Sequence, residues 1–240
     1  MIQDLILDKK YKDVGVKLSG GADSAIVYYA VCDYYKNTNT NVYALTMGTL
    51  LKPWYPVGSA KLIKIVGKLT GVYPVEHYIH HQPDHTAISG GEAYAEGIMD
   101  MDELAVKRFE LDAIYSGLTV NPPIDEMQRF FKDNHLRFGL NLNELMGHID
   151  GRDASRDTTL EPTFFTKRYG LQRVDRIRPF INKNKQAVHA AYALHDMMEQ
   201  LYPYTYSCET VPEDYSTMDF VHCGHCFFCL ERYWGFGRIV

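Results

Sequence analysis

Residues 19–24, Ser-Gly-Gly-Ala-Asp-Ser, have the composition of a phosphate-binding turn. They follow the apolar run Val14–Leu18, which predicts a short strand, and precede Ala25–Cys32, which predicts a helix. The glycines allow a sharp turn and a close approach of the backbone to a ligand. Free N–H groups and a helix N-terminus would then point at one place, where both favour an anion. The sequence therefore predicts a phosphate site between this strand and this helix.

Side chains in and near this hexapeptide could complete a nucleotide site. Ser19 and Ser24 carry hydroxyl donors, and the Asp23 carboxylate can help to hold a Mg²⁺ ion that bridges phosphates. Lys185 begins a predicted helix, where an anion could sit; a solvated surface lysine is the alternative. We assign Asp23, Ser24 and Lys185 as candidate catalytic residues. The candidate nucleotide-binding residues are Ser19, Gly20, Gly21, Asp23, Ser24, Met47 and Gly117.

The last two of these residues belong to Met47-Gly48 and Ser116-Gly117, which end two predicted strands. A glycine there would let an adenine or ribose ring approach the backbone, or would simply turn the chain. The hexapeptide is neither a Walker A loop nor a Gly-x-Gly-x-x-Gly turn, and an ordinary glycine turn is its structural alternative. Ser89-Gly90-Gly91 lacks the Asp-Ser pair and predicts a loop.

The C-terminal cysteines have the spacing of a metal site. Two residues separate Cys223 from Cys226 and Cys226 from Cys229, and Cys208 lies upstream. Four thiolates fill a tetrahedral site, which favours a structural Zn²⁺ ion over a catalytic one. A cysteine-ligated iron–sulfur cluster and a set of unrelated buried thiols are the alternatives. Cys32, in the apolar helix after the hexapeptide, is expected to pack in the core.

Apolar runs and helical patterns alternate along the chain, which predicts a parallel sheet with crossover helices. The predicted strands are Asp13–Leu18, Asn41–Thr46, Tyr73–Ile79, Asp112–Ser116 and Val174–Ile181. The predicted helices are Ser24–Tyr35, Val57–Thr70, Gly91–Phe109 and Asn184–Leu201. In such open sheets the ligand binds beyond the carboxyl ends of the strands, near the switch in strand order, and the hexapeptide meets that condition.

Two regions are expected outside this regular pattern. Residues 121–172 predict an insertion or lid within a nucleotide-binding domain of residues 1–200, and residues 201–240 predict a metal-binding C-terminal segment. In the last predicted helix, helical spacing predicts one buried stripe of Val188, Ala191, Leu194, Met198 and Leu201. The cluster His77, His80, His81 and His85 predicts solvated loop histidines rather than a second metal site.

The amino-acid composition and net charge of the chain limit the kinds of partner that it can bind. The chain of 240 residues has a net charge of −5 and 46% hydrophobic residues, which indicates a folded protein without an overall electrostatic footprint for nucleic acid. No apolar run reaches membrane-spanning length and no signal-peptide pattern is present, so we expect a cytoplasmic protein with no membrane partner. A homodimer is left open.

The segment Lys167–Arg178 is locally basic in this acidic chain. Its cations are Lys167, Arg168, Arg173, Arg176 and Arg178. We expect this segment and part of the insertion to border the active site and to contact phosphates of a nucleotide or of RNA. The alternative is a solvated face whose arginines pair with Asp150, Asp153, Asp157 and Glu161.

The hexapeptide resembles the PP-loop of the N-type ATP pyrophosphatases. Together with the C-terminal motif, the chain resembles the 7-cyano-7-deazaguanine synthase family within that group. The residues that match its C-terminal motif are Cys208, Cys223, Gly224, Cys226, Cys229 and Arg232. Pro179-Phe180 followed by Lys185–Val188, and Ser207-Cys208, also resemble family segments. The middle departs, because Met47-Gly48-Thr49 stands where the family has a Tyr-Gly-Gln-like turn.

The resemblance implies an α/β fold, a doubly wound parallel sheet of the adenine-nucleotide α-hydrolase type with a small zinc-bound C-terminal appendage. It implies an enzyme that uses ATP, Mg²⁺ and Zn²⁺, releases pyrophosphate, transfers AMP to a small-molecule carboxylate, and admits ammonia as the second nucleophile. The substrate would be 7-carboxy-7-deazaguanine, converted through an amide to a nitrile. The alternatives are an ATP pyrophosphatase that acts on RNA or a free nucleotide, for example in thiolation, and a non-catalytic nucleotide-binding module.

Overall fold

The computed structural model describes residues 11–49, 52–81, 90–134, 141, 143–147, 174–208 and 220–239. It confirms the α/β class, with five parallel strands in the order β3-β2-β1-β4-β5. The strands are β1 (Asp13–Lys17), β2 (Asn41–Gly48), β3 (His77–His81), β4 (Ala113–Tyr115) and β5 (Asp175–Ile177). Strand order reverses direction between β1 and β4, so the carboxyl end of β1 lies at the switch point where ligands bind in such sheets.

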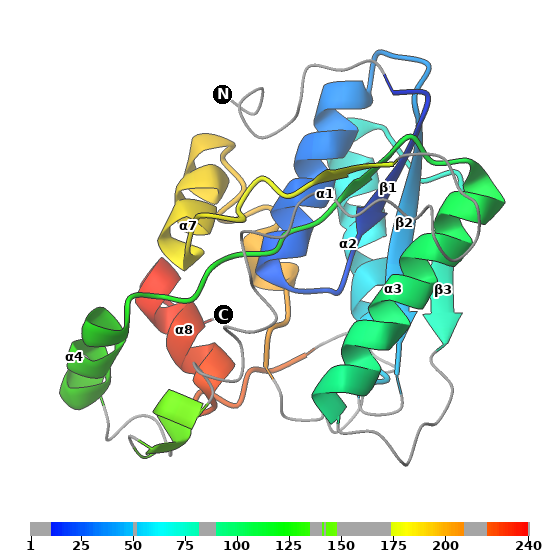
Figure 1. Ribbon diagram of the computed structural model, residues 1–240. Coiled ribbons are helices and arrows are strands. Elements are labelled where there is room, and N and C mark those ends of the chain that lie inside the picture. The colour runs from blue at the N-terminus through cyan, green and yellow to red at the C-terminus, as the bar shows by residue number, and fades with distance from the viewer. Residues whose placement is uncertain are drawn as a thin grey trace.

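Helices cover both faces of the sheet (Figure 1). The helical elements are α1 (Ala22–Tyr35), α2 (Tyr55–Thr70), α3 (Gly90–Phe109), α4 (Ile124–Asn134), α7 (Lys185–Leu194), the 3-10 turn η2 (Tyr202–Tyr204) and α8 (Phe227–Phe236). One core joins α1, α2 and α7 to one face, and a second core joins α3 to the other. The sheet is therefore doubly wound, as predicted.

Alternation along β1 assigns its side chains to these two cores. Val14 and Val16 are fully buried in the core that contains α1. Lys17 points to the other face, where it meets Asp102 of α3. Strand β1 is thus anchored on both faces of the sheet, and residues 19–24 follow almost directly after its last residue, Lys17.

The C-terminal region is folded onto this sheet domain. Leu201, Tyr202 and Phe236 belong to the same core as β1 and α1, and α8 packs against α7. Helix α4 lies beside α8, at the left of Figure 1 and away from β3. A third apolar cluster forms there around the cysteines.

Three predicted elements are shorter or shifted, and Gly90 and Gly91, which were predicted to lie in a loop, begin α3. Helix α7 ends at Leu194, because Asp196 adopts a left-handed backbone with φ of 56°, and Leu194 is 53% exposed rather than part of a buried stripe. Strand β3 begins only at His77, after a loop in which Tyr73 and Val75 are exposed. Strand β5 ends at Ile177, because the chain turns at Pro179, where Ile181 N–H donates to Arg178 O.

The described part of the chain holds no helix that combines the length and the apolar character needed to cross a bilayer.

Candidate active site and metal centre

The hexapeptide forms the predicted strand-to-helix turn at the carboxyl end of β1. Gly20 has φ of 87°, a left-handed conformation that favours glycine, and Gly21 is the N-cap of α1. The Ser24 hydroxyl donates to Gly21 O (3.0 Å) and accepts from Ser19 N–H (3.2 Å). These two hydrogen bonds hold Ser19 and Gly21 of the loop against Ser24 in the first turn of α1. A compact turn of this kind presents backbone N–H groups to an anion.

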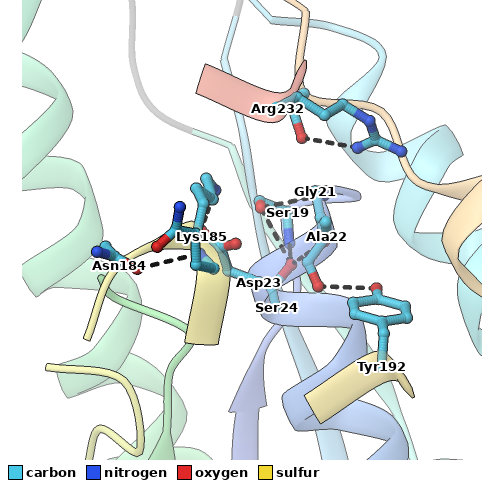
Figure 2. Close-up of polar contacts among 11 residues, drawn as sticks. Ser19, Gly21, Ala22, Asp23, Ser24, Asn184, Lys185, Tyr192 and Arg232 are labelled. Atoms are coloured by element: carbon cyan, nitrogen blue, oxygen red, sulfur yellow. Dashed lines mark hydrogen bonds and ion pairs between the residues drawn. The ribbon is translucent and has the colours of Figure 1, made fainter. Parts of the chain in front are cut away.

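Asp23 and Lys185 form an ion pair between the first turns of α1 and α7, although they are 162 residues apart in sequence. Figure 2 shows the two side chains facing each other beside the loop. Asn184 caps α7 by accepting from Gln186 N–H (3.0 Å), which fixes the first turn that carries Lys185. The second carboxylate oxygen of Asp23, Oδ1, is buried and has no hydrogen-bond partner among the residues that the structure describes. The structure thus brings together all three candidate catalytic residues.

Two glycines allow the backbones around this pair to approach closely. A Cβ atom at Gly117 would lie 2.5 Å from the Asp23 carbonyl carbon, so the end of β4 packs directly on the loop. A Cβ atom at Gly235 of α8 would lie 2.4 Å from Lys185 Cβ. Gly117 therefore has a packing role; its proposed contact with a nucleotide stays a prediction.

Met47 lies near the end of β2 but faces the α3 side of the sheet. Its side chain is 4% exposed and belongs to the apolar core around Leu45 and Met101. Contact with a nucleotide through its backbone stays a prediction.

A buried hydrogen-bond network links β2, α2 and β3 to Leu18, the residue that precedes the loop of residues 19–24. The Thr46 hydroxyl donates to Leu18 O (2.8 Å), and the Ser59 hydroxyl donates to Tyr55 O (2.9 Å). His77 Nε2 lies 2.9 Å from the Thr46 hydroxyl and 3.2 Å from the Ser59 hydroxyl, so a neutral ring is hydrogen-bonded to both. Burial lowers the pKa of His77, which favours this neutral ring. The prediction of solvated loop histidines is thus wrong for His77, because it lies in β3 and points to α2. His80 and His81 also lie in β3 rather than in a loop, His80 half-buried and His81 exposed, and His85 lies outside the described residues.

The segment that leads to the cysteines is attached to the loop. Tyr206 N–H donates to Gly20 O (2.9 Å), and Ser207 Oγ lies 3.6 Å from the position of a Cβ atom on Gly21. Arg232 of α8 donates to Ser207 Oγ (3.3 Å), and Figure 2 shows it on the side of the loop away from Lys185. The sequence motif contains Arg232 but does not predict these contacts, because residue spacing alone does not show which groups a side chain meets in the fold.

The four predicted metal ligands converge. Cys208, Cys223, Cys226 and Cys229 place their Sγ atoms within 4.8 Å of one another. Sγ of Cys208 and Sγ of Cys226 are 3.7 Å apart, and Sγ of Cys223 and Sγ of Cys229 are 3.9 Å apart. Hydrogen bonds from the neighbouring thiols and burial raise the pKa of Cys229, so these thiols are costly to ionise without a cation among them. Four converging thiols are a donor set that fits a thiolate-bound metal. Cys208, one of these four residues, lies two residues after Tyr206, which contacts Gly20 of the loop.

The basic segment is only partly described: Lys167, Arg168 and Arg173 lie outside the described residues, as do the acids proposed as their partners. Arg176 Nη2 of β5 lies 3.1 Å from Oδ2 of Asp102, a fully buried carboxylate that Lys17 Nζ also contacts at 2.5 Å. Burial lowers the pKa of Lys17, while Asp102 opposes that shift. Arg176 therefore contributes to a buried charge cluster that links β1, β5 and α3.

Comparison with known proteins agrees with this fold. No protein-family model and no curated protein sequence matches the chain. Among solved structures, the chain is similar to U34-tRNA thiolase NcsA from Methanococcus maripaludis, determined with its [4Fe-4S] cluster. The TM-score is 0.51 at 17% sequence identity, over 90% of this chain and 68% of the thiolase. The chain thus has the α/β fold of this tRNA thiolase, with a cluster of four cysteines in its C-terminal region.

Proposed function

We propose that this chain is an ATP pyrophosphatase that cleaves ATP between the α and β phosphates and transfers AMP to a substrate oxygen. The observation that carries the proposal is the Ser19–Ser24 loop at the switch point of the sheet, with Asp23 and Lys185 paired beside it. The sequence resemblance to the PP-loop enzymes and the structural likeness to an RNA thiolase support the same general activity.

In this proposal the loop holds the leaving pyrophosphate. The N–H groups at the start of α1 and the hydroxyls of Ser19 and Ser24 supply fixed donors for its oxygens. Lys185 supplies a nearby cation, because Asn184 and Gly235 fix the first turn of α7 next to Asp23. Positioning and electrostatic stabilisation then provide the catalysis.

The buried, unpartnered Oδ1 of Asp23 fits a Mg²⁺ ligand. A bound Mg²⁺ ion would neutralise phosphate charge, and Asp23 is the residue that would hold it.

We propose a carboxylate as the acceptor and ammonia as the second nucleophile. A carboxylate oxygen forms a bond to the α-phosphorus, the bond from that phosphorus to the bridging oxygen breaks, and pyrophosphate leaves with the electron pair. Ammonia then adds to the acyl carbon, loses a proton, and expels AMP to give an amide. By resemblance to the 7-cyano-7-deazaguanine synthases, the acceptor is 7-carboxy-7-deazaguanine, and a second ATP-dependent round removes the amide oxygen to leave a nitrile.

The spacing of the sulfurs supports a single Zn²⁺ ion at the cysteines. A tetrahedral ion with Zn–S bonds of about 2.3 Å holds its sulfurs about 3.8 Å apart. The two short Sγ–Sγ distances, 3.7 and 3.9 Å, agree with this value. A cubane iron–sulfur cluster binds each cysteine to a different iron, which would hold the four sulfurs further apart.

Sulfur transfer to RNA is the second candidate, because the structural neighbour is a tRNA thiolase. The cysteines argue against it. Four thiolates leave no open position on a tetrahedral ion, and Cys32, the fifth cysteine, is fully buried in α1. Burial raises the pKa of Cys32 to about 12, so this thiol is a poor sulfur carrier.

Product analysis would test the proposal and separate the candidates. One arm contains ATP, Mg²⁺, ammonia and 7-carboxy-7-deazaguanine, and the other contains ATP, Mg²⁺, sulfide and unmodified tRNA. We expect pyrophosphate release and an amide or nitrile product, detected by mass spectrometry, only in the first arm. Thiolated tRNA in the second arm would favour the alternative, and pyrophosphate release in neither arm would contradict the ATP chemistry.

A further inference from the structure

Arg232 is a buried cation whose contacts are all with neutral groups. Its side chain is 1% exposed. The guanidinium donates to Ser207 Oγ (3.3 Å), Thr205 Oγ1 (2.8 Å) and Tyr202 O (3.2 Å), and it lies 4.0 Å from the centre of the Tyr202 ring. Across the described ranges, no carboxylate forms an ion pair with it. A buried charge without an anionic partner is costly, so the presence of an arginine here calls for an explanation.

The residues that Arg232 holds form a short connection between the loop and the cysteines. Thr205 and Ser207 flank Tyr206, whose N–H donates to Gly20 O (2.9 Å) in the anion-binding loop. Cys208, the first ligand of the cysteine cluster, follows directly. A shift of this connection would therefore move both the loop and the metal site.

A metal bound by the four cysteines would place negative charge near Arg232. A divalent ion bound by four thiolates carries a net charge of about −2. Cys229 precedes Arg232 by three residues, so the two stand on neighbouring turns at the same side of α8. Burial lowers the pKa of Arg232, and interactions with Tyr202, Tyr192, Cys229 and Asp23 oppose that shift. A metal-loaded thiolate centre would therefore add negative charge on the side of α8 that carries this cation.

We propose that Arg232 is a positioning residue that couples the metal centre to the anion-binding loop. With metal bound, Arg232 holds Thr205 and Ser207 in place, and the Tyr206 contact holds Gly20 in its left-handed conformation. Without metal, this connection loosens and the loop loses affinity for pyrophosphate. The inference rests on the proposed ATP function for its ligand, but the Tyr206–Gly20 contact can be measured without any ligand.

The experiment compares Arg232→Lys with the parent, both as full chains with their metal. Lysine keeps the charge but cannot form the three-way fork. We expect metal content to be unchanged, hydrogen exchange of the Tyr206 amide to rise at least tenfold, and affinity for inorganic pyrophosphate with Mg²⁺ to fall about tenfold, which is about 1.4 kcal/mol. Amides of β1 and β2 should keep their protection, whereas a general loss of stability would raise exchange there too.

Arg238→Lys is the matched control. Arg238 also lies beside the Tyr202 ring (5.5 Å) and donates to Met198 O (2.7 Å), but it pairs with Glu199 rather than with the connection. We expect no change in the Tyr206 amide or in pyrophosphate binding. If Arg232→Lys does not fold, Ser207→Ala removes one acceptor of the fork and should raise Tyr206 exchange in the same way.

Chelation of the metal from the parent should also raise Tyr206 exchange and weaken pyrophosphate binding, and addition of Zn²⁺ should restore both. Unchanged Tyr206 exchange in the metal-free parent and in the Arg232 or Ser207 variant would overturn the coupling. If the metal-loaded parent does not bind pyrophosphate, the proposed function fails, and the exchange data alone decide the coupling.

Discussion

Gly117 packs against the backbone of Asp23. A Cβ atom at residue 117 would lie 2.5 Å from the Asp23 carbonyl carbon and 2.7 Å from Ser24 N. The end of β4 and the start of α1 are therefore in direct contact, and the fold fixes the loop from the side as well as from β1.

Gly117→Ala should be strongly disruptive for this reason. Its methyl group meets backbone atoms that cannot move aside, and overpacking of this kind costs about 1–3 kcal/mol. We expect a lower midpoint in denaturant unfolding and a loss of pyrophosphate binding. Gly147→Ala is the control, because a Cβ atom there meets no atom of the described residues within 4 Å. Equal stability of the two variants would contradict the packing role.

Asp102 should be essential for stability rather than for substrate binding. It is fully buried and contacts both Lys17 and Arg176, so Asp102→Asn removes the negative charge that these two cations share. Breaking such a buried pair costs about 3–5 kcal/mol, which denaturant titration would show. Asp33→Asn breaks an exposed pair with Lys36 and should change stability by less than about 1 kcal/mol. A small effect at Asp102 would rule out this structural assignment.

One equivalent of metal should accompany the freshly prepared protein. Cys226→Ser removes one of four converging sulfurs, so we expect it to lower the metal content and to loosen the C-terminal region. Elemental analysis and limited proteolysis measure the two effects. Freshly prepared parent protein without metal would refute the assignment.

His77 should make folding sensitive to mild acid. Burial lowers its folded pKa below the unfolded value of about 6.5, so the unfolded chain takes up the proton first as the pH falls. The contribution of neutral His77 is therefore complete above about pH 6.5 and declines below it. We expect the unfolding free energy of the parent to fall between pH 7.5 and 5.5, and to fall less in His77→Gln. Identical slopes would exclude His77 as a source.

The sequence predicted the parts of the molecule in which residue type determines geometry. Glycines and hydroxyls placed the loop after β1, and the two-residue spacing of Cys223, Cys226 and Cys229 placed a metal site. Parallel strands alternating with helices followed from the apolar runs. Each of these signals depends on residues that are close together in the sequence, so a single sequence is enough to predict the structure that they form.

Features that depend on tertiary contacts could not be predicted in this way. The pairing of Lys17 with Asp102 requires knowing that α3 covers the second face of the sheet. The burial of His77 requires the register of β3 beside β2, which sets Ala44 opposite His77. The early end of α7 follows from the left-handed Asp196, a residue type that does not by itself stop a helix.

The most direct test of the account identifies the products of ATP. With Mg²⁺, ammonia and the carboxylate acceptor, ³¹P NMR should show AMP and pyrophosphate from the parent protein. Asp23→Asn should lower the rate on the order of a hundredfold or more, because it removes a charged group beside the proposed phosphate site. Formation of ADP and phosphate, or unchanged pyrophosphate release by Asp23→Asn, would contradict the account.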